Sequence, residues 1–326
     1  MRFLVYTTLF LLLFGCKKDM EDGRDLSWKK IPYTTIDQNQ SEFHGLGIAD
    51  IEFIDDKIGY LSGTQTYHEP AVKIYKTIDG GSNWSRWNGT GIGCGAGSYG
   101  GRIIFTSAST GFVAYSCLGW KISKTADGGQ SWNQEIINID NENIGFELSI
   151  NEIFLGSQKS TNGGQTWVPF NLPVQANEVS GYYLLDTLNG YFSTTTGLIL
   201  ETNDLGSTWD TLYNNSENNF SMITMVDSNT IIVGGNKIII SHDKGQSWNY
   251  AYVGGFVNDI KFLNSSIGFA GCTNGLILKT NDGGNTWSQN YDCNFMGINT
   301  LEVINEQTLI AAGSSRFILK TTTQGN

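Results

Sequence analysis

Three features of the sequence predict an all-β fold built from a repeated unit of four short strands. A phrase ending in tryptophan recurs at intervals of 35 to 48 residues, and an apolar, strand-like segment precedes each copy. Glycine is abundant, with 40 residues, and proline is rare, with 4, which favours tight turns over linkers. Hydrophobic residues make up 40% of the chain, which is enough for a core and excludes a mainly disordered protein.

The N-terminal residues have the pattern of an export signal. Arg2 precedes an apolar run over residues 3–14, which is too short to span a bilayer as a mature helix. The run ends at Gly15-Cys16, and polar residues follow at once. This pattern resembles the processing site of bacterial lipoproteins, which implies removal of residues 1–15 and acylation of Cys16. An ordinary secretory signal with an incidental cysteine is the alternative.

Residues 16–25 are expected to form an acylated tether. Their acidic stretch, residues 17–22, resembles the export tether of surface lipoproteins in the Bacteroidetes. Several acyl chains on one cysteine anchor a protein stably, whereas one chain alone is marginal. The resemblance implies an outer-membrane lipoprotein that is exposed at the bacterial surface, with the periplasmic face as the alternative.

The region 26–326 carries six copies of the repeated phrase. The first copy runs from Thr77 to Trp84, with the sequence TIDGGSNW. The third position of the copies is Asp79, Asp127, Asn162, Asp204, Asp243 and Asp282. The closing aromatic residue is Trp84, Trp132, Trp167, Trp209, Trp248 and Trp287.

Each repeat contains about four short strands. An apolar alternation such as residues 276–279 precedes each copy, and a Gly-aromatic pair such as Gly268-Phe269 begins another strand upstream. A further apolar run, such as residues 260–263, comes before that pair. Four strands in about 40 residues is the size of one blade of a β-propeller. Such blades bury both faces only when they pack in a closed ring.

The two ends of the sequence predict how the ring closes. Residues 317–321 repeat the third strand of the unit, and residues 26–33 resemble the segment that follows a copy of the phrase. We therefore expect a seven-bladed β-propeller of four-stranded antiparallel blades over residues 26–326, in which the N-terminal strand closes the last blade. The third blade has the least distinct strands.

The phrase Ser/Thr-x-Asp-x-Gly-x-Ser/Thr-Trp resembles the Asp-box, or bacterial neuraminidase repeat. In that family the box is the hairpin between the third and fourth strands. The carboxylate accepts hydrogen bonds from turn amides, glycine permits a positive φ, and the tryptophan buries a large ring. One carboxylate per blade cannot converge on one substrate, so we expect a structural role rather than catalysis or metal binding. Asn162 fits this role because its amide oxygen also accepts hydrogen bonds.

The arginine content separates the families that carry this box. Sialidases require three convergent arginines, whereas this propeller region contains Arg86, Arg102 and Arg316, with Arg86 expected on an outer strand. The sequence resembles the photosystem II stability and assembly factors and their bacterial relatives, which are single seven-bladed propellers. That resemblance implies a non-catalytic protein-binding scaffold. The basic patch described for plant and cyanobacterial members has no counterpart arginine cluster here.

Charge and composition limit the classes of partner that the protein can bind. The net charge of −11 argues against nucleic acid. We expect a monomer that binds an envelope or secreted protein, or an extracellular glycan, and requires no cofactor or metal. His44 and His68, with Glu42 and Glu69, could form a zinc site, but solvated loop residues are the default interpretation. A glycan-binding protein, or a glycoside hydrolase or lyase on the same fold, is the alternative function.

Two further groups of residues are candidates for a role in the folded protein. The expected blade positions pair Cys94 with Cys117 and Cys272 with Cys293 as disulfides, with buried thiols as the alternative. The face opposite the boxes would carry aromatic side chains suited to a peptide or glycan, or these rings would instead fill the space between blades. They are Phe43, Tyr67, Tyr99, Trp120, Tyr182, Phe220, Phe256 and Phe295.

Overall fold

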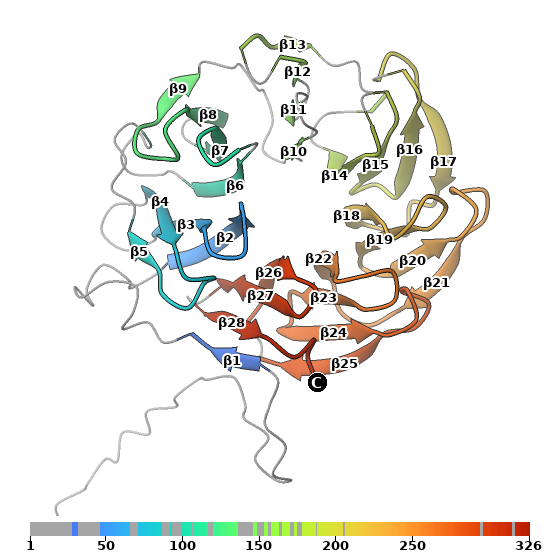
Figure 1. Ribbon diagram of the computed structural model, residues 1–326. Coiled ribbons are helices and arrows are strands. Elements are labelled where there is room, and N and C mark those ends of the chain that lie inside the picture. Colours follow the sequence, from blue (N-terminus) through green and yellow to red (C-terminus); the bar gives the residue numbers. More distant parts are fainter. Residues whose placement is uncertain are drawn as a thin grey trace, which may run out of the picture.

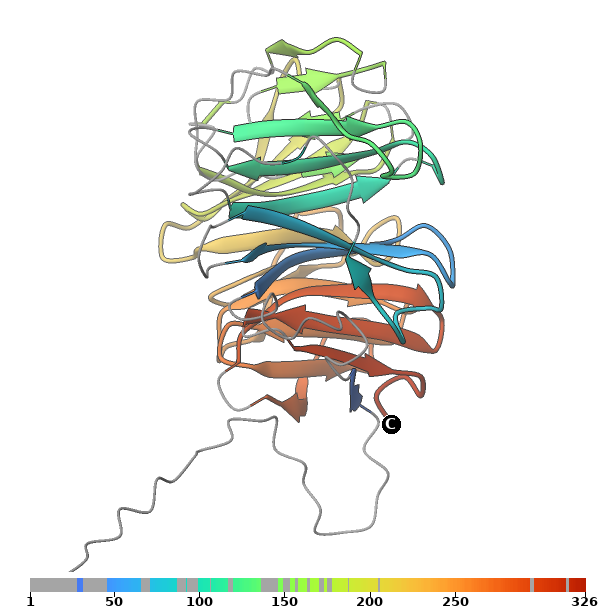
Figure 2. The ribbon, with the colours of Figure 1, turned by 90° about the vertical axis from the view of Figure 1, so that its left-hand side faces the viewer.

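The computed structural model is an all-β ring. It describes residues 28–31, 46–65, 71–86, 92, 99–105, 107–116, 120–135, 146–148, 153–155, 158–162, 165–169, 173–174, 178–186, 188–204, 206–293, 296–314 and 317–326. The strands within these ranges pair in seven four-stranded antiparallel sheets. Figure 1 shows the sheets arranged around a common centre, and Figure 2 shows the ring from its side. The predicted all-β propeller with four-stranded antiparallel blades is confirmed.

Six sheets follow chain order from the innermost to the outermost strand. The first contains β2 (Leu46–Phe53), β3 (Gly59–Gln65), β4 (Ala71–Thr77) and β5 (Ser85–Arg86). The second contains β6 (Tyr99–Phe105), β7 (Gly111–Ser116), β8 (Trp120–Thr125) and β9 (Asn133–Glu135). The third contains β10 (Phe146–Leu148), β11 (Ile153–Leu155), β12 (Gln158–Ser160) and β13 (Val168–Pro169).

The next three sheets have longer strands than the third. The fourth sheet contains β14 (Val179–Leu184), β15 (Gly190–Thr194), β16 (Leu198–Thr202) and β17 (Asp210–Asn214). The fifth contains β18 (Phe220–Met225), β19 (Ile231–Gly235), β20 (Ile238–Ser241) and β21 (Asn249–Tyr252). The sixth contains β22 (Val257–Phe262), β23 (Gly268–Cys272), β24 (Leu276–Thr280) and β25 (Ser288–Asp292).

The seventh sheet joins the two ends of the chain. It contains β26 (Ile298–Asn305), β27 (Thr308–Gly313), β28 (Ile318–Thr321) and β1 (Trp28–Lys30) as its outer strand. Trp28 lies opposite Thr321 in this antiparallel pair. The Trp28 indole also donates a 2.6 Å hydrogen bond to Asn290 Oδ1, so the N-terminal strand contacts the sixth sheet as well. The N-terminal strand therefore takes the position that the sequence predicts for it.

The core lies between neighbouring sheets. The second strands β15, β19, β23 and β27 are buried along their whole length, whereas the residues of the outer strands β17, β21 and β25 are exposed or half-buried. Apolar side chains of adjacent sheets interlock, as Ile51 and Leu61 do with Ile310. The ring is therefore stabilised by burial between sheets rather than within one sheet.

The Gly-aromatic pairs noted in the sequence have a packing reason. A Cβ atom on Gly268 would lie 2.7 Å from the ring of Phe262, and one on Gly59 would lie 2.8 Å from the ring of Phe53. Each phenylalanine ends an inner strand and covers the start of the second strand. Glycine is thus required where this ring crosses the neighbouring backbone.

A second turn motif joins the first and second strands. The Asp227 carboxylate accepts hydrogen bonds from the backbone N–H groups of Asn229 and Thr230, at 2.8 and 2.9 Å. Equivalent side-chain oxygens belong to Asp55, Ser107, Asp186, Asn264 and Asn305. Our sequence reasoning missed this motif, although in four of these six turns an Asp, Asn or Ser stands four residues before a Gly-aromatic pair. Among the described segments there is no helix long and apolar enough to cross a bilayer.

Candidate functional site

The repeated boxes form turns between the third and fourth strands. In the sixth box, Asp282 accepts hydrogen bonds from the Thr286 amide, at 2.9 Å, and from the hydroxyls of Thr286 and Thr280, at 2.6 and 2.7 Å. The Thr280 hydroxyl also accepts from the Gly284 amide at 2.9 Å. The same pattern recurs around Asp79, Asp127, Asp204 and Asp243. In the third box the Asn162 oxygen accepts from the Thr166 amide at 2.9 Å.

A seventh, degenerate turn lies near the C-terminus, and our sequence reasoning missed it. The Gly325 amide donates to the Thr321 hydroxyl at 3.0 Å, as the box glycines do, and Thr323 takes the position of the aspartate. Gly325 has a φ of 70°, which matches the glycines of the other boxes. The signal in the sequence was weak because Thr323 replaces the aspartate and the tryptophan opposite Thr321 is Trp28, from the other end of the sequence.

The box carboxylates are strongly hydrogen-bonded anions. The hydroxyl and amide of Ser131 lower the pKa of Asp127 to about 2, and those of Ser247 do the same for Asp243. The indole N–H groups of Trp84, Trp248 and Trp287 each donate to a glycine carbonyl in the same turn, at 3.0 to 3.1 Å. These contacts are all local, so each box stabilises its own hairpin.

A cluster of charged side chains lines the inner strands. We call it the inner-strand cluster, and it consists of Asp50, Glu52, Arg102, Asp259, Lys261 and Glu302, which attract or repel one another electrostatically. Asp50, Asp259 and Glu302 are buried. Our sequence reasoning read these strands as apolar runs and missed the acidic residues, although polar and apolar residues alternate there.

Each buried carboxylate of this cluster binds the backbone of the next sheet. Asp50 Oδ2 accepts from the Ile103 amide at 3.0 Å, and Asp259 Oδ2 accepts from the Leu301 amide at 2.8 Å. Glu302 Oε1 accepts from the Phe53 amide at 3.1 Å. All three contacts join inner strands of neighbouring sheets.

Amide side chains make a second set of contacts between the same strands. The Asn258 amide donates to the Ile298 carbonyl at 2.6 Å, and the Asn299 amide donates to the Ile48 carbonyl at 2.8 Å. The Ser221 hydroxyl donates to the Val257 carbonyl. Asn258 lies at the irregularity between Val257 and Asp259 in the strand register, where it reaches the next sheet.

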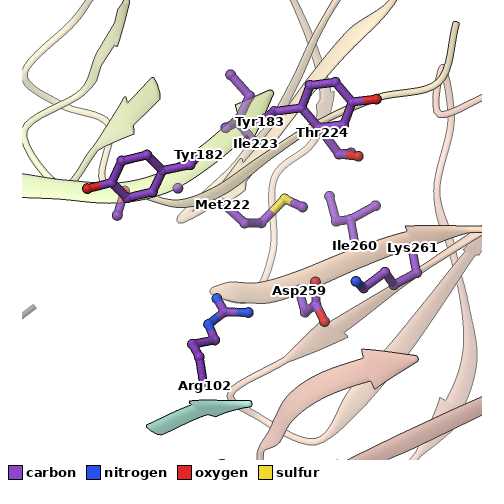
Figure 3. A pocket seen from close by; sticks show the side chains of 11 residues that line it. Arg102, Tyr182, Tyr183, Met222, Ile223, Thr224, Asp259, Ile260 and Lys261 are labelled. Atoms are coloured by element: carbon purple, nitrogen blue, oxygen red, sulfur yellow. The ribbon is translucent and has the colours of Figure 1, made fainter. Parts of the chain in front are cut away.

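A cavity of about 160 Å³ adjoins the cluster. Its lining comes from β6, β14, β18 and β22, so four sheets contribute to it. Figure 3 shows Arg102, Asp259 and Lys261 on one side, with Met222 and the tyrosines of β14 opposite. The Lys261 side chain is 42% exposed. The partial loss of water around its ammonium group would lower its pKa, but the nearby carboxylates of Asp259 and Glu302 outweigh this effect and raise the pKa. The cavity therefore combines charged groups with an aromatic and apolar wall.

Three of the eight residues of the predicted aromatic face have side chains that the structure describes. Tyr182 lines the cavity but is itself buried, and burial raises its pKa. Phe220 is fully buried between sheets, and Phe256 is half-buried. Phe43, Tyr67 and Phe295 lie outside the described residues, as do the side chains of Tyr99 and Trp120 at the starts of β6 and β8. Phe220 therefore fills the space between sheets, which was the alternative to a role on a binding face.

The structure corrects the predicted disulfide between Cys272 and Cys293. Both residues are buried thiols that are not bonded to each other. Cys272 packs with Ile260 between the fifth and sixth sheets, whereas Cys293 packs with Phe269 and Phe317 between the sixth and seventh. The two side chains thus belong to different interfaces of one sheet, which keeps them from pairing. Cys94 and Cys117 lie outside the described residues.

The histidines do not form a site in the described part of the chain. His242 is exposed in the fifth box, and its Nε2 lies 2.8 Å from Asn285 Oδ1 of the sixth box. His44, His68, Glu42 and Glu69 lie outside the described residues. Within the described ranges, no group of three His, Cys, Asp or Glu side chains has an arrangement that could hold a metal ion.

The two arginines in the described ranges lie on strands of different sheets. Arg86 is on the outer strand β5, as predicted, whereas Arg102 is on the inner strand β6 at the cavity. Arg316 lies outside the described residues. The described arginines therefore do not converge as a sialidase site requires.

Comparison with known proteins identifies the repeat and the fold. Residues 158–255 match the family model described as photosynthesis system II assembly factor YCF48. No curated protein sequence matches the chain. The structure is similar to YCF48 from Cyanidioschyzon merolae, with a TM-score of 0.68 and 16% identity, over 90% of this chain and 98% of that one. It is also similar to YCF48 bound to D1 peptide, with a TM-score of 0.71 and 18% identity, over 92% and 98% of the chains.

A glycoside hydrolase shares the same architecture. The GH74 xyloglucanase from Xanthomonas campestris has a TM-score of 0.67 and 10% identity, over 92% of this chain and 54% of the enzyme. At such identities these likenesses show the fold alone. The resemblance drawn from the boxes is confirmed: the chain is a β-propeller that matches the YCF48 family model over residues 158–255 and has YCF48 among its structural neighbours.

Proposed function

We propose that this protein is a non-catalytic propeller scaffold that binds a polypeptide partner at the bacterial envelope. The observation that carries the proposal is the cavity at the inner strands, which four sheets line with charged, aromatic and apolar groups together. Such a mixed lining suits the side chains of a bound polypeptide. We take the seven sheets as the blades of one closed ring, which gives the cavity a rigid frame.

The carboxylates near the cavity support a structural role rather than acid–base catalysis. Asp50, Asp259 and Glu302 each hold a backbone amide of the next sheet. A carboxylate that is bound in this way serves the packing of the inner strands. The similarity to YCF48 bound to D1 peptide, which is a propeller with a peptide partner, adds support for polypeptide binding.

The proposed location depends on the N-terminal sequence. Residues 1–15 would be removed and Cys16 acylated, so that residues 16–25 tether the propeller to the outer membrane. Incorporation of a labelled fatty acid tests this step, and Cys16→Ala should abolish the label. Retention of the label in Cys16→Ala would contradict the proposed anchor.

Crosslinking in intact native cells tests the binding role. Wild type and Arg102→Ala, which alters the cavity, are compared with Arg86→Ala, which alters the outer strand β5. We expect a protein partner in near-equal amount with wild type and Arg86→Ala, and at least tenfold less with Arg102→Ala. Recovery of no protein partner would overturn the scaffold function, whereas equal recovery from all three would overturn only the cavity as the site.

A glycan-binding or glycoside-hydrolase function is the second candidate. The shared fold of the GH74 xyloglucanase and the position of the Asp259 carboxylate in the cavity lining favour it. A polysaccharide panel that includes xyloglucan, with reducing-sugar release as the readout, tests it. Release by wild type that is lost in Asp259→Asn, measured at a temperature where thermal unfolding shows that this variant is folded, would replace the scaffold proposal.

A further inference from the structure

The inner-strand cluster contains more acidic than basic groups. Its four carboxyl groups are on β2, β22 and β26, whereas its two cations are Arg102 on β6 and Lys261 on β22. Three of the carboxyl groups are buried, with 7 to 9% of each residue exposed. Burial makes charge costly and strengthens repulsion between like charges. The cluster therefore carries a surplus of negative charge in a poorly solvated place.

Glu302 occupies the centre of this arrangement. Its Oε1 accepts a hydrogen bond from the Phe53 amide of β2 at 3.1 Å, and its Oε2 lies 3.8 Å from Lys261 Nζ of β22. One carboxyl group thus connects the seventh sheet to both of its neighbours. The contact between β26 and β2 is the seam where the first and last sheets meet.

The groups that face Glu302 come from each strand packed beside it. From β22 these are Asp259 and Lys261, and from β2 it is Asp50, while Glu52 of β2 acts on Lys261. Arg102 of β6 acts on Asp50, which in turn repels Glu302. The adjacent strand β27, over Thr308–Gly313, contains no titratable side chain.

The charges around Glu302 determine how it responds to protons. Burial raises the pKa of Glu302 to about 7, because the attraction of Lys261 and the Phe53 amide offsets burial only in part, while Asp50 and Asp259 repel the anion. Burial also raises the pKa of Asp50. The cluster thus holds a proton more tightly in the folded chain than in the unfolded one.

We propose that the seam between β26 and β2 is a proton-sensitive contact, which mild acid strengthens and mild base weakens. A proton on Glu302 removes one negative charge from the surplus and leaves Oε1 able to accept from Phe53. A carboxyl group that binds its proton more tightly when folded makes stability rise as pH falls from about 8 to about 5. This direction is opposite to that of the box carboxylates, which lose their stabilising charge only at lower pH.

Glu302→Gln and Glu306→Gln form a matched pair for the test. Glutamine at 302 keeps an oxygen for the Phe53 amide but cannot be charged. Glu306 is exposed in the turn after the same strand, so its variant controls for the loss of one carboxylate. Urea unfolding is followed by tryptophan fluorescence at pH 5.5 and pH 8.0. The histidines also titrate between these pH values, but they are present in wild type and in both variants. Their contribution to the pH dependence of stability therefore cancels when the three proteins are compared.

For wild type and Glu306→Gln, we expect the equilibrium constant for unfolding to be about tenfold larger at pH 8.0 than at pH 5.5. Glu302→Gln should lose most of this difference. Hydrogen exchange in a peptide spanning 46–53, corrected for the intrinsic rate, should show faster opening at pH 8.0 in wild type and Glu306→Gln but not in Glu302→Gln. An unchanged pH dependence in Glu302→Gln would overturn the proposal. If that variant does not fold, a wild-type ¹³C titration midpoint of Glu302 below pH 5 would overturn it.

Discussion

The carboxylate of Asp259 in β22 accepts a hydrogen bond from the backbone N–H of Leu301 in β26, with 2.8 Å between Oδ2 and N. The residues belong to neighbouring sheets and both are buried. Asp50 and the Ile103 amide make the same contact between the first and second sheets. Backbone pairing ends at the boundary of each sheet, so these side chains supply the polar contacts between inner strands.

Removal of the Asp259 carboxylate should therefore destabilise the ring. In Asp259→Ala the buried Leu301 amide loses its acceptor, which costs about 1–3 kcal/mol. Asp259→Asn retains an oxygen and should lose less than half as much. Urea unfolding followed by tryptophan fluorescence measures both variants, with Asp210→Ala on the exposed strand β17 as the control. Equal loss in the Asn and Ala variants would show that charge, rather than the hydrogen bond, is what Asp259 contributes.

Lys244 predicts a stabilising substitution in the fifth box. It has a φ of 57°, whereas the equivalent turn positions Gly80, Gly128 and Gly283 have φ of 70 to 71°. A residue with a side chain is strained in this region by about 1 kcal/mol. Lys244→Gly should therefore raise the free energy of unfolding, by up to about 1 kcal/mol, even though glycine has the more flexible unfolded chain.

The reverse change provides the matched comparison. A Cβ atom at Gly283 would lie 2.9 Å from the Ser265 carbonyl oxygen. Gly283→Ala should lower the stability by about 1–2 kcal/mol, since strain and this contact act together. Thermal unfolding of the two variants at one pH measures the contrast. A destabilised Lys244→Gly would mean that the lysine makes a contact worth more than its backbone strain.

The periodic parts of the fold could be predicted from the sequence because they depend on local rules. The hydrogen bonds of the box aspartate and tryptophan form between residues a few positions apart, so Asp282 and Trp287 predict a turn without information from the rest of the sequence. Alternation and glycine position likewise indicate strands such as β23 and β24. Our sequence reasoning missed the degenerate turn at Thr321 because Thr323 replaces the aspartate and the tryptophan of this box, Trp28, is remote in sequence, although the Gly325 contact is kept.

The inner-strand cluster could not be predicted in the same way. Asp50 and Asp259 are 209 positions apart in the numbering and come together only because the ring closes. The predicted disulfide was wrong for a related reason. Cys272 and Cys293 are near in sequence, but Cys272 at the end of β23 packs toward the fifth sheet, whereas Cys293 just after β25 packs toward the seventh.

The two described cysteines should behave as inert thiols. Burial raises the pKa of the Cys272 thiol to about 12, so it has little thiolate at neutral pH. In a Cys94→Ser, Cys117→Ser variant of the mature propeller that lacks Cys16, a thiol reagent should react with neither residue in the native state. Both should react after unfolding in urea. Absence of two reactive thiols in the unfolded, unreduced protein would show that the disulfide exists after all.

The box carboxylates predict a loss of stability in acid that is separate from the effect of Glu302. Hydrogen bonds from Ser131 and Ser247 lower the pKa of Asp127 and Asp243 to about 2, below the ordinary value of 3.8. The folded chain then binds fewer protons than the unfolded chain between these values, so stability is fully present above about pH 4 and falls toward pH 2. The midpoint of urea unfolding, measured from pH 5 to pH 2.5, follows this loss. The double variant Ser131→Ala, Ser247→Ala should lower stability at pH 5 and flatten the acid dependence, whereas Ser82→Ala in the first box should leave the slope unchanged. An acid slope that is as steep in the double variant as in wild type would assign the loss to other carboxylates.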